Sequence, residues 1–450
     1  TSWNVTMMFG LEALQVEEHI DDNLRPFDTS TKITGGLNKS VSKPLAYYVS
    51  GDSDGSVGFA AQLLEQGVKV RALNKASTMG NDSLSRGSVV IQMADNTLSR
   101  DVLEKMIEQA AKNTGVVVSG IAKGAGEGFQ PDIGSKHFVI LEKPQVAILS
   151  GKATNLYDMG NIWHLMDTRL GIRHSHLDAN QLDKVNLSFY NVLILPDQYN
   201  DSAFSEKELK KLDNWVKNGG TLIAVDDAAA ALAKADDFTK VKLLEDIGEQ
   251  QQDFDLSLQR EWLAKQDKIT NGELVYSHQI SSDINVPWST DKDVKPLDKK
   301  SYDRWTKWTG NFMPSGAMIS GSTDQKHWLT YGTNSILPLL TADAPIFMSD
   351  DKSQAVIRYG NWMKDSKAKS QQLGWAQIPE GYSMQVRMSG LVWPEAQQRI
   401  ANGAYLTRED KGKGQVILFS GQPNFRGATR GTARLLLNAI VYGPGLGTKV

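Results

Sequence analysis

The chain contains no cysteine among its 450 residues. This absence excludes disulfide bonds, thiolate-bound zinc and a cysteine nucleophile in a single step. It leaves the cellular compartment open, because a chain of this length can bury a core large enough to fold without covalent cross-links.

Two further features are missing. The sequence has no run of about 18 apolar residues, which a membrane-spanning helix would need. It also has no basic excess, since 49 Lys and Arg stand against 52 Asp and Glu and give a net charge of -3. Nucleic-acid-binding proteins usually show a positive excess or stripe. We therefore expect neither a membrane span nor a nucleic-acid partner.

Zinc-peptidase motifs are absent as well. Neither His-x-x-Glu nor His-Glu-x-x-His occurs around the seven histidines. The only close pair is His174 and His176. On a strand both rings would point to one face and could share a metal ion, but a solvated edge strand is the interpretation that we favour. We therefore assign no metal ligand and no cofactor to this chain.

What is present is an alternation of strand and helix patterns. After a connector at 1–43, two similar units follow within 44–143, each read as strand, helix and strand. In the second helix Val102, Met106 and Ala110 form one apolar stripe, and Gly115 ends the helix. Alternating strands and helices predict a small α/β domain here, with a parallel sheet.

Strongly apolar strands mark the next block, residues 144–450. QVAILSG, NVLILPDQ and TLIAVDD are near-continuous apolar runs, typical of strands buried on both faces of a parallel sheet. Ser205 and Glu208 form a capping box for a helix that Gly219 and Gly220 end. GQVILFSG and TARLLLNAIVYG add a closing strand and helix. These patterns predict a three-layer α/β domain with a parallel sheet.

A long insertion, from about 250 to 410, interrupts this domain. It holds eight of the 11 tryptophans, between Trp262 and Trp393, and its short polar breaks indicate β-rich or irregular structure. The tryptophans could form a sugar-stacking surface. The interpretation that we favour is that they fill an irregular core.

The corner after TLIAV (221–225) is the most distinctive candidate site. A strand-to-helix corner is where a nucleophile elbow could sit, and here Asp226 and Asp227 occupy it. Two neighbouring carboxylates could do acid/base work if their pKa values were split. Capping of the following helix is the commoner role of such acids, and it is the one that we favour.

Four stretches spread over nearly the whole chain carry a family resemblance: 1–16 (TSWNVTMMFGLEALQV), 131–149 (PDIGSKHFVILEKPQVAIL), 314–332 (PSGAMISGSTDQKHWLTYG) and 412–440 (GKGQVILFSGQPNFRGATRGTARLLLNAI). They resemble the region that follows the catalytic domain in large secreted bacterial zinc carboxypeptidases of the carboxypeptidase A superfamily. The resemblance implies that a zinc-binding catalytic domain precedes Thr1, and that the protein is periplasmic or secreted. The zinc ligands would belong to that domain, so no catalytic residue is carried over to this sequence.

Residues from about 145 onward also resemble a class I glutamine amidotransferase-like fold. In that fold the corner after TLIAV bears the nucleophilic cysteine, whereas here Asp226 and Asp227 stand there. The resemblance therefore implies a domain that has lost amidotransferase chemistry.

Three functions follow from these patterns. The first is an accessory, non-catalytic region that packs on its own peptidase domain or binds a peptide or cell-wall peptide substrate. The second is a cryptic hydrolase with a pocket at the carboxyl ends of the strands. The third is a tryptophan-based carbohydrate-binding module. The pocket of the second hypothesis would gather five polar residues: Asp197, Asp226, Asp227, Asn424 and Arg426.

Overall fold

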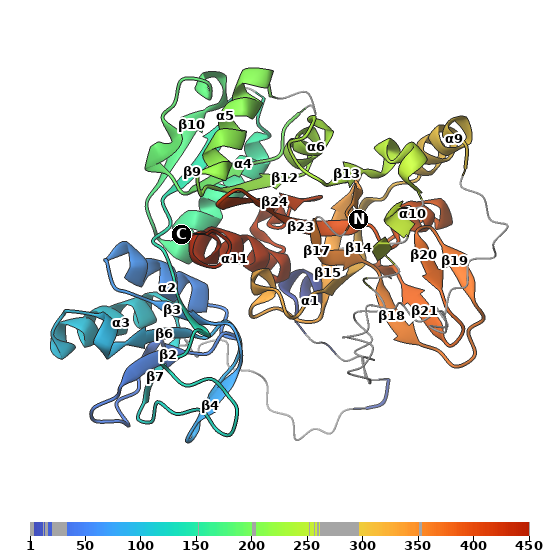
Figure 1. Cartoon of the computed structure of the whole chain (residues 1–450). Helices are drawn as coiled ribbons and strands as arrows, with labels where there is room; N and C mark the ends of the chain where they lie inside the picture. Colours follow the sequence, from blue (N-terminus) through green and yellow to red (C-terminus); the bar gives the residue numbers. More distant parts are fainter. Residues whose placement is uncertain are drawn as a thin grey trace, which may run out of the picture.

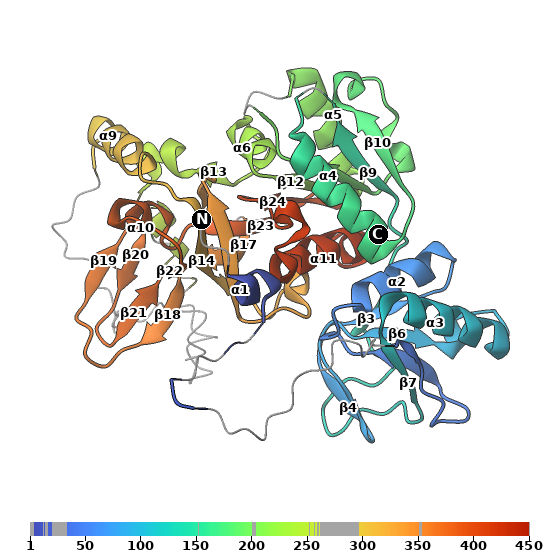
Figure 2. The same ribbon diagram turned by 180° about the vertical axis from the view of Figure 1, so that it is seen from behind.

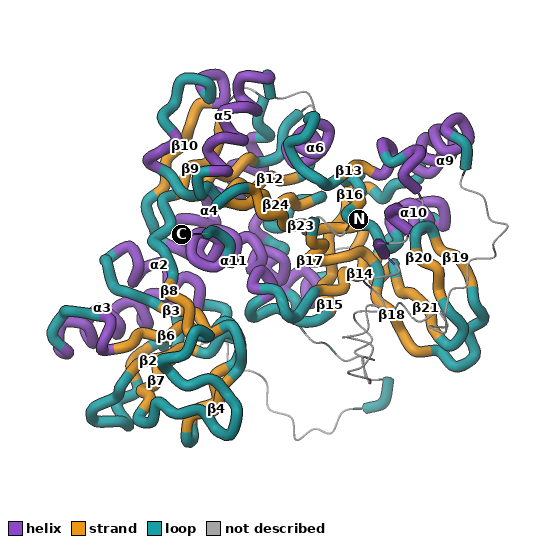
Figure 3. Tube along the Cα trace, viewed as in Figure 1, coloured by secondary structure: helices purple, strands orange, loops and turns teal. Residues whose placement is uncertain are grey.

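The computed structural model shows an α/β protein with a small domain beside a large one (Figures 1 and 3). The structure describes residues 4–11, 13, 17–19, 34–151, 153–199, 204–251, 253–255, 257–258, 261, 297–350 and 353–449. About half of the predicted connector at 1–43 lies outside these residues. None of the helices within them is long and apolar enough to span a bilayer.

The small domain is built around a mixed sheet with two helices on one face (Figure 1). Its elements are β1 (Gly36–Leu37), β2 (Ala46–Val49), α2 (Ser56–Glu65), β3 (Arg71–Leu73), β4 (Ser77–Met79), β5 (Asp82–Leu84), β6 (Val89–Gln92), α3 (Arg100–Thr114), β7 (Val117–Ile121) and β8 (Phe138–Ile140). The strand order is β1-β7-β2-β6-β3-β8. The core of this order, β7-β2-β6-β3 with a helix after β2 and after β6, is the split βαβ arrangement of ferredoxin-like folds.

The expectation of a parallel sheet in this domain is wrong. Strands β2 and β3 both pair antiparallel with β6, β2 also pairs antiparallel with β7, and only β1 with β7 is parallel. Strand–helix–strand alternation makes the two strands run in the same direction, but it does not make them neighbours. Here β6 lies between β2 and β3, and β2 lies between β6 and β7. Each such pair of parallel strands is therefore separated by an antiparallel strand.

Helix α3 forms where it is expected, and the predicted stripe is right in part: Ala110 is buried and Met106 packs, partly buried, against the core. The buried residues are Leu103, Ile107, Ala110 and Ala111, whereas Val102 is 46% exposed. Gly115 ends the helix in the left-handed conformation at φ 69°, as predicted.

The large domain begins with five parallel strands. Its elements here are β9 (Val146–Ser150), α4 (Leu156–Leu165) continued by a short π-helix (Met166–Leu170), β10 (His174–Asp178), β11 (Val192–Leu195), α5 (Glu206–Lys217), β12 (Thr221–Val225), α6 (Asp227–Lys234), β24 (Gly414–Phe419) and α11 (Arg430–Leu446). The strands lie in the order β10-β9-β11-β12-β24, and each neighbouring pair is parallel. Taken in chain order this is 2-1-3-4-5, the doubly wound arrangement of flavodoxin-like folds.

Side-chain alternation along these strands produces the predicted three layers. Ile148, Ile194 and Ile223 belong to the core that contains α4 and α11. Their neighbours in sequence, such as Leu149 and Leu195, belong to the core under α5 and α6. Both faces are covered, so the strands are apolar throughout. The capping box of α5 is present, with the Ser205 amide donating to Glu208 Oε2 at 2.7 Å and the Glu208 amide donating to Ser205 Oγ at 3.4 Å.

The Trp-rich insertion continues this sheet rather than forming a separate body (Figure 3). The short strand β13 (Lys242–Leu243) precedes it, and its own elements are α9 (Lys299–Gly310), β14 (Ser315–Thr323), β15 (Ile336–Ala342), β16 (Phe347–Met348), β17 (Gln354–Tyr359), β18 (Asn361–Lys364), β19 (Gln371–Leu373), β20 (Ala376–Ile378), β21 (Tyr382–Gln385), β22 (Arg387–Ser389), α10 (Pro394–Ile400) and β23 (Ala404–Lys411). Beyond β24 the sheet runs on as β23-β17-β14-β15, all antiparallel. The region is therefore β-rich, as the sequence indicates.

Helix α11 joins the parts of the molecule. Arg434 on this helix is 4% exposed, and its guanidinium donates to the carbonyl oxygens of Gly51 and Ser53, both at 2.9 Å, in the turn before α2. Arg434 Nε donates to Asn438 Oδ1, and the Asn438 amide donates in turn to the carbonyls of Leu329 (2.8 Å) and Tyr331 (2.9 Å) in the insertion. From behind, the short helix α1 (Val5–Phe9) also lies against α11 (Figure 2).

Replacing Arg434 with Met should lower the free energy of unfolding by about 3 kcal/mol, because buried carbonyl and hydroxyl acceptors lose their donor. Urea unfolding followed by circular dichroism measures this loss. Arg430→Met, an exposed change one turn away on the same helix, is the matched control and should shift the midpoint little. Equal destabilisation by both variants would contradict this role of Arg434.

Candidate functional site

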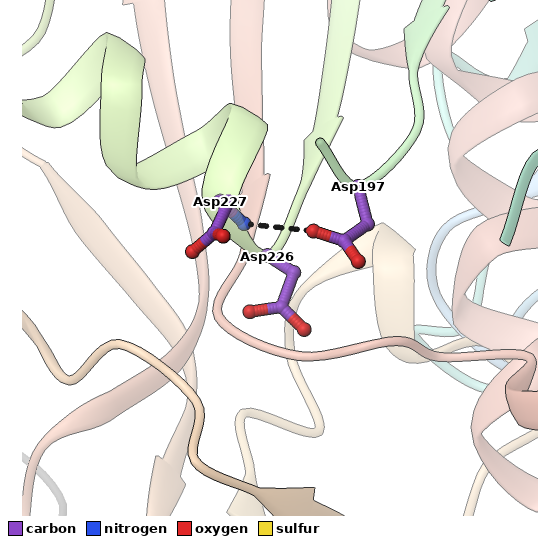
Figure 4. Close-up of side chains that lie close together, drawn as sticks. All are labelled: Asp197, Asp226 and Asp227. Atoms are coloured by element: carbon purple, nitrogen blue, oxygen red, sulfur yellow. Dashed lines mark hydrogen bonds between the residues drawn. The ribbon is translucent and has the colours of Figure 1, made fainter. Parts of the chain in front are cut away.

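Three of the five predicted pocket residues meet at the carboxyl edge of the parallel sheet. Asp197 follows β11, Asp226 follows β12 directly, and Asp227 is the first residue of α6 (Figure 4). Adjacent parallel strands end at the same edge, so residues just after them are brought together. One carboxylate oxygen from each of the three lies within 4.8 Å of the others. Within the described residues this acidic corner, Asp197, Asp226 and Asp227, is the single group of three such side chains close enough to share a cation.

Asp197 is fixed from three directions. Its Oδ2 accepts hydrogen bonds from the Asn155 side-chain amide at 2.7 Å and from the Gln422 amide at 3.3 Å. Its Oδ1 accepts from the Asp227 backbone N–H at 3.3 Å, the contact drawn in Figure 4. These bonds join the loops that follow β9, β11, β12 and β24, so Asp197 sets the geometry of the whole edge.

Asp226 occupies a strained corner. Its φ of 52° and ψ of -121° lie outside the regions that L-residues favour, and such conformations cost about 1–3 kcal/mol. The capping interpretation is wrong for this residue, because its side chain accepts no capping hydrogen bond. The corner thus has the sharp strand-to-helix geometry of a nucleophile elbow, with a carboxylate in the place of a nucleophile.

Burial and neighbouring negative charges raise the pKa of the carboxyl group at this corner. Burial raises the pKa of Asp226 well above its usual range, and the negative charges of Asp197, Asp227, Asp158 and Asp343 raise it further. This environment favours the neutral acid at Asp226.

A second buried acid lies behind Asp197. Burial raises the pKa of Asp158 to about 7, the charge of Asp197 adds to this, and a hydrogen bond from the Asp197 N–H at 2.8 Å opposes it. Asp158 Oδ1 has no hydrogen-bond partner. Burial and the charge of Asp197 therefore favour a proton on Asp158 below neutral pH.

An open cleft of about 330 Å³ lies beside the acidic corner, between α6 and the insertion. Asp227 and Lys234 line it from α6, Asp343 from the loop after β15, and Glu245 and Arg399 from the far side. Arg399 donates to Glu245 Oε2 at 3.0 Å and to the carbonyl of Thr306 at 3.0 Å. Arg399 therefore ties the insertion to the segment just before it.

The other two predicted residues lie elsewhere. Asn424 is buried and donates to the carbonyl of Asn161 on α4 at 2.8 Å, and it lines a separate cavity of about 40 Å³. Arg426 is exposed, with its guanidinium 5.0 Å from the centre of the Phe425 ring. The loop after β24 reaches the acidic corner through Gln422 instead.

Sequence reasoning missed Asp158, Asp343, Asn155 and Gln422. Asp158 and Asn155 had a usable signal, because they follow β9, the strand next to β11. Asp343 had none, since it comes from an insertion whose path the sequence does not define.

A Gly-x-Ser-x-Gly spacing does occur, at 51–55, in the turn between β2 and α2. Ser53 is not among the residues with positive φ, so this turn lacks the strained backbone of an elbow. Its carbonyl oxygen instead accepts the hydrogen bond from Arg434.

The tryptophans that the structure describes in the insertion mostly pack inward. Trp305, Trp362 and Trp375 pack against the main core, and Trp328 is buried within it. Trp308 and Trp393 are about half exposed, and each meets Phe312 edge-on, at interplanar angles of 65° and 66°. Trp262 and Trp288 lie outside the described residues. The described rings thus form no coplanar row for a sugar to stack on.

No family model matches the chain, and no curated protein matches it. Among solved structures, a putative ThuA-like protein from Parabacteroides merdae is 12% identical, with a TM-score of 0.35, over 68% of this chain and 92% of that one. A cytoplasmic protein from Salmonella typhimurium is 10% identical, with a TM-score of 0.31, over 66% and 99% of the two chains. A β-galactosidase from Bacillus circulans is 11% identical, with a TM-score of 0.29, over 68% and 32%. These values describe a distant likeness in fold only. The large domain itself is a three-layer α/β domain whose parallel strands lie in the order β10-β9-β11-β12-β24.

The raised pKa of Asp158 predicts a pH-dependent loss of stability. Between the ordinary value of 3.8 and about 7 the folded chain holds a proton that the unfolded chain has lost. The free energy of unfolding therefore falls as pH rises through this window, by up to about 4 kcal/mol from this group. Urea unfolding of wild type and Asp158→Asn from pH 4.5 to 7.5 should show the difference between them closing or reversing as pH rises. The exposed Asp303→Asn serves as control, and a difference that stays constant with pH would refute the assignment.

Asp226→Gly should stabilise the fold by about 1–2 kcal/mol, because glycine adopts positive φ without strain and its added backbone entropy offsets only part of the gain. Thermal unfolding measures the shift. Asp227→Gly, one residue further on in α6, should instead lower stability by about 1 kcal/mol. Destabilisation by both changes would show that the corner is not strained.

Proposed function

We propose that this chain is the accessory, non-catalytic region of a periplasmic or secreted zinc carboxypeptidase-like protein, and that its cleft binds a basic group of the peptide substrate. The observation that carries the proposal is the cleft beside the acidic corner, which stands where an amidotransferase-like fold would hold its nucleophile. The corner residue that lines the cleft is Asp227. A carboxylate there suits the site to binding rather than to acyl transfer.

The charges of the cleft favour a cationic group. Three of its lining residues are acidic, namely Asp227, Glu245 and Asp343, against two basic ones, Lys234 and Arg399. Arg399 is paired with Glu245, which leaves two acids, Asp227 and Asp343, against one base, Lys234. The charges of both acids act on Asp226 at the corner. An ammonium or guanidinium group there would gain charge-assisted hydrogen bonds.

The N-terminal segment supports the accessory role. Helix α1 packs on α11 with Met8 buried, while Val5 is 63% and Leu11 is 60% exposed. We propose that a neighbouring domain covers these exposed apolar side chains. A preceding peptidase domain, as the resemblance implies, would be that neighbour.

A hydrolase that uses the corner is the second candidate, and the strained, proton-holding Asp226 is the observation that favours it. A neutral acid close to two other carboxylates is the arrangement that general acid and base catalysis needs. Turnover of a peptide or glycoside that Asp226→Asn abolishes would establish this candidate over simple binding.

Calorimetric titration with a short peptide that is acetylated at its N-terminus, amidated at its C-terminus and contains one lysine tests the binding proposal. Its norleucine analogue, which has nearly the same shape and no charge, is the control ligand. Asp227→Asn should weaken lysine-peptide binding by about 10- to 100-fold, the cost of one charge-assisted hydrogen bond. Asp303→Asn, an exposed acid on α9 outside the cleft, should leave it unchanged. Equal binding of both peptides by the wild type would overturn the proposal.

A further inference from the structure

The acidic corner, Asp197, Asp226 and Asp227, has the spacing of a calcium site. One carboxylate oxygen from each residue lies within 4.8 Å of the other two (Figure 4). A point no more than about 2.8 Å from all three oxygens therefore exists, and a Ca²⁺–oxygen bond is about 2.3–2.6 Å long. Shifts of a few tenths of an ångström at most bring all three onto one ion. Mg²⁺ fits less well, because it demands shorter bonds of about 2.0–2.1 Å and near-ideal octahedral geometry.

The hydrogen bonds of Asp197 orient it and leave it able to bind an ion. Asn155 and Gln422 donate to its Oδ2 at 2.7 and 3.3 Å, and the Asp227 N–H donates to its Oδ1 at 3.3 Å. Each carboxylate oxygen has two lone pairs, so Oδ1 keeps one of them for an ion. Carboxylates that bind metals are typically held in place by such hydrogen bonds.

A buried acceptor with no donor lies directly behind these three acids. Asp158 is 1% exposed, and within the described part of the chain its Oδ1 has no hydrogen-bond partner. Its other oxygen accepts the Asp197 N–H at 2.8 Å, and its charge acts on Asp226, so this carboxyl group belongs to the corner. Thr154 Oγ1 and Gln198 Oε1, in the loops after β9 and β11, are buried and unpartnered as well. Buried oxygens of this kind are costly unless a donor or a cation meets them.

The charges around Asp226 also favour a cation. The four charges that act most strongly on it are all carboxylates, and together with burial they raise its pKa. A proton on Asp226 removes one negative charge from this group. A divalent ion offsets two, and it acts on all of the surrounding carboxylates at once.

We propose that Asp197, Asp226 and Asp227 bind a Ca²⁺ ion, and that Asp158 Oδ1 accepts a hydrogen bond from a water molecule on that ion. An all-oxygen set of carboxylates is the donor set that hard cations prefer. Ca²⁺ takes about 6–8 oxygen ligands, so water completes its shell from the side of the open cleft, which Asp227 lines. The ion would tie the loop after β11 to the start of α6. This site does not rest on the proposed function, because it needs the corner alone and no peptide in the cleft.

The test is a titration of the full chain, first stripped of metal with a chelator, with Ca²⁺ alone at slightly alkaline pH, by calorimetry and by equilibrium dialysis. Wild type should bind one ion per chain. Asp226→Asn should weaken binding by at least about tenfold, because one of three charged ligands is lost. Asp158→Asn should weaken it by about tenfold, because an amide nitrogen in the place of Oδ1 cannot accept from the water. Asp303→Asn, an exposed acid on α9, is the matched control and should bind as wild type does.

Two further measurements make the result decisive. Ca²⁺ should raise the thermal unfolding midpoint of wild type but not that of Asp226→Asn, which should fold because asparagine tolerates positive φ. Mg²⁺ should bind at least about tenfold more weakly than Ca²⁺. Ca²⁺ binding by a chain that does not bind the lysine peptide would support the ion site alone. Absence of Ca²⁺ binding by wild type, equal binding by wild type and Asp226→Asn, or tighter binding of Mg²⁺ than of Ca²⁺ would overturn the proposal.

Discussion

The buried guanidinium of Arg434 is the contact on which the arrangement of the molecule depends. It sits on α11, inside the core, and its donors are matched to carbonyl oxygens of the β2–α2 turn and to Asn438. The Asn438 amide donates hydrogen bonds to two backbone carbonyls of the insertion. A buried polar network of this kind is stable only when every member is satisfied. It therefore fixes three segments, distant in sequence, at one place.

The acidic corner depends on the same scaffold. Asp197 collects donors from loops that follow β9, β12 and β24, and the strands between them are held by cores on both faces. This rigidity allows Asp226 to stay in an unfavourable backbone conformation among like charges. Strain and raised pKa concentrated at one corner are features of functional sites more than of structural ones.

The parallel half of the large domain could be read from the sequence, because QVAIL, NVLIL and TLIAV are apolar at every position and leave little choice of environment. Asp226 and Asp227 were found for the same reason, since they follow such strands. On α3 only the first residue of the stripe was misplaced, by one position, as Val102 and Leu103 are equally apolar. The pairing of β6 with β2 and β3 joins segments that local sequence patterns do not connect. The same is true of the position of Asp343 close to Asp226.

The pairing of β12 with β24 has a consequence for synthesis. Thr221 lies opposite Gln415, so almost the entire insertion must leave the ribosome before β12 gains its second neighbour. Until then β12 is an edge strand with unpaired backbone groups and an apolar side chain at nearly every position. Such an edge can pair with other chains. The nascent protein therefore keeps this apolar edge exposed until β24 emerges, and truncation ahead of β24 would make that exposure permanent.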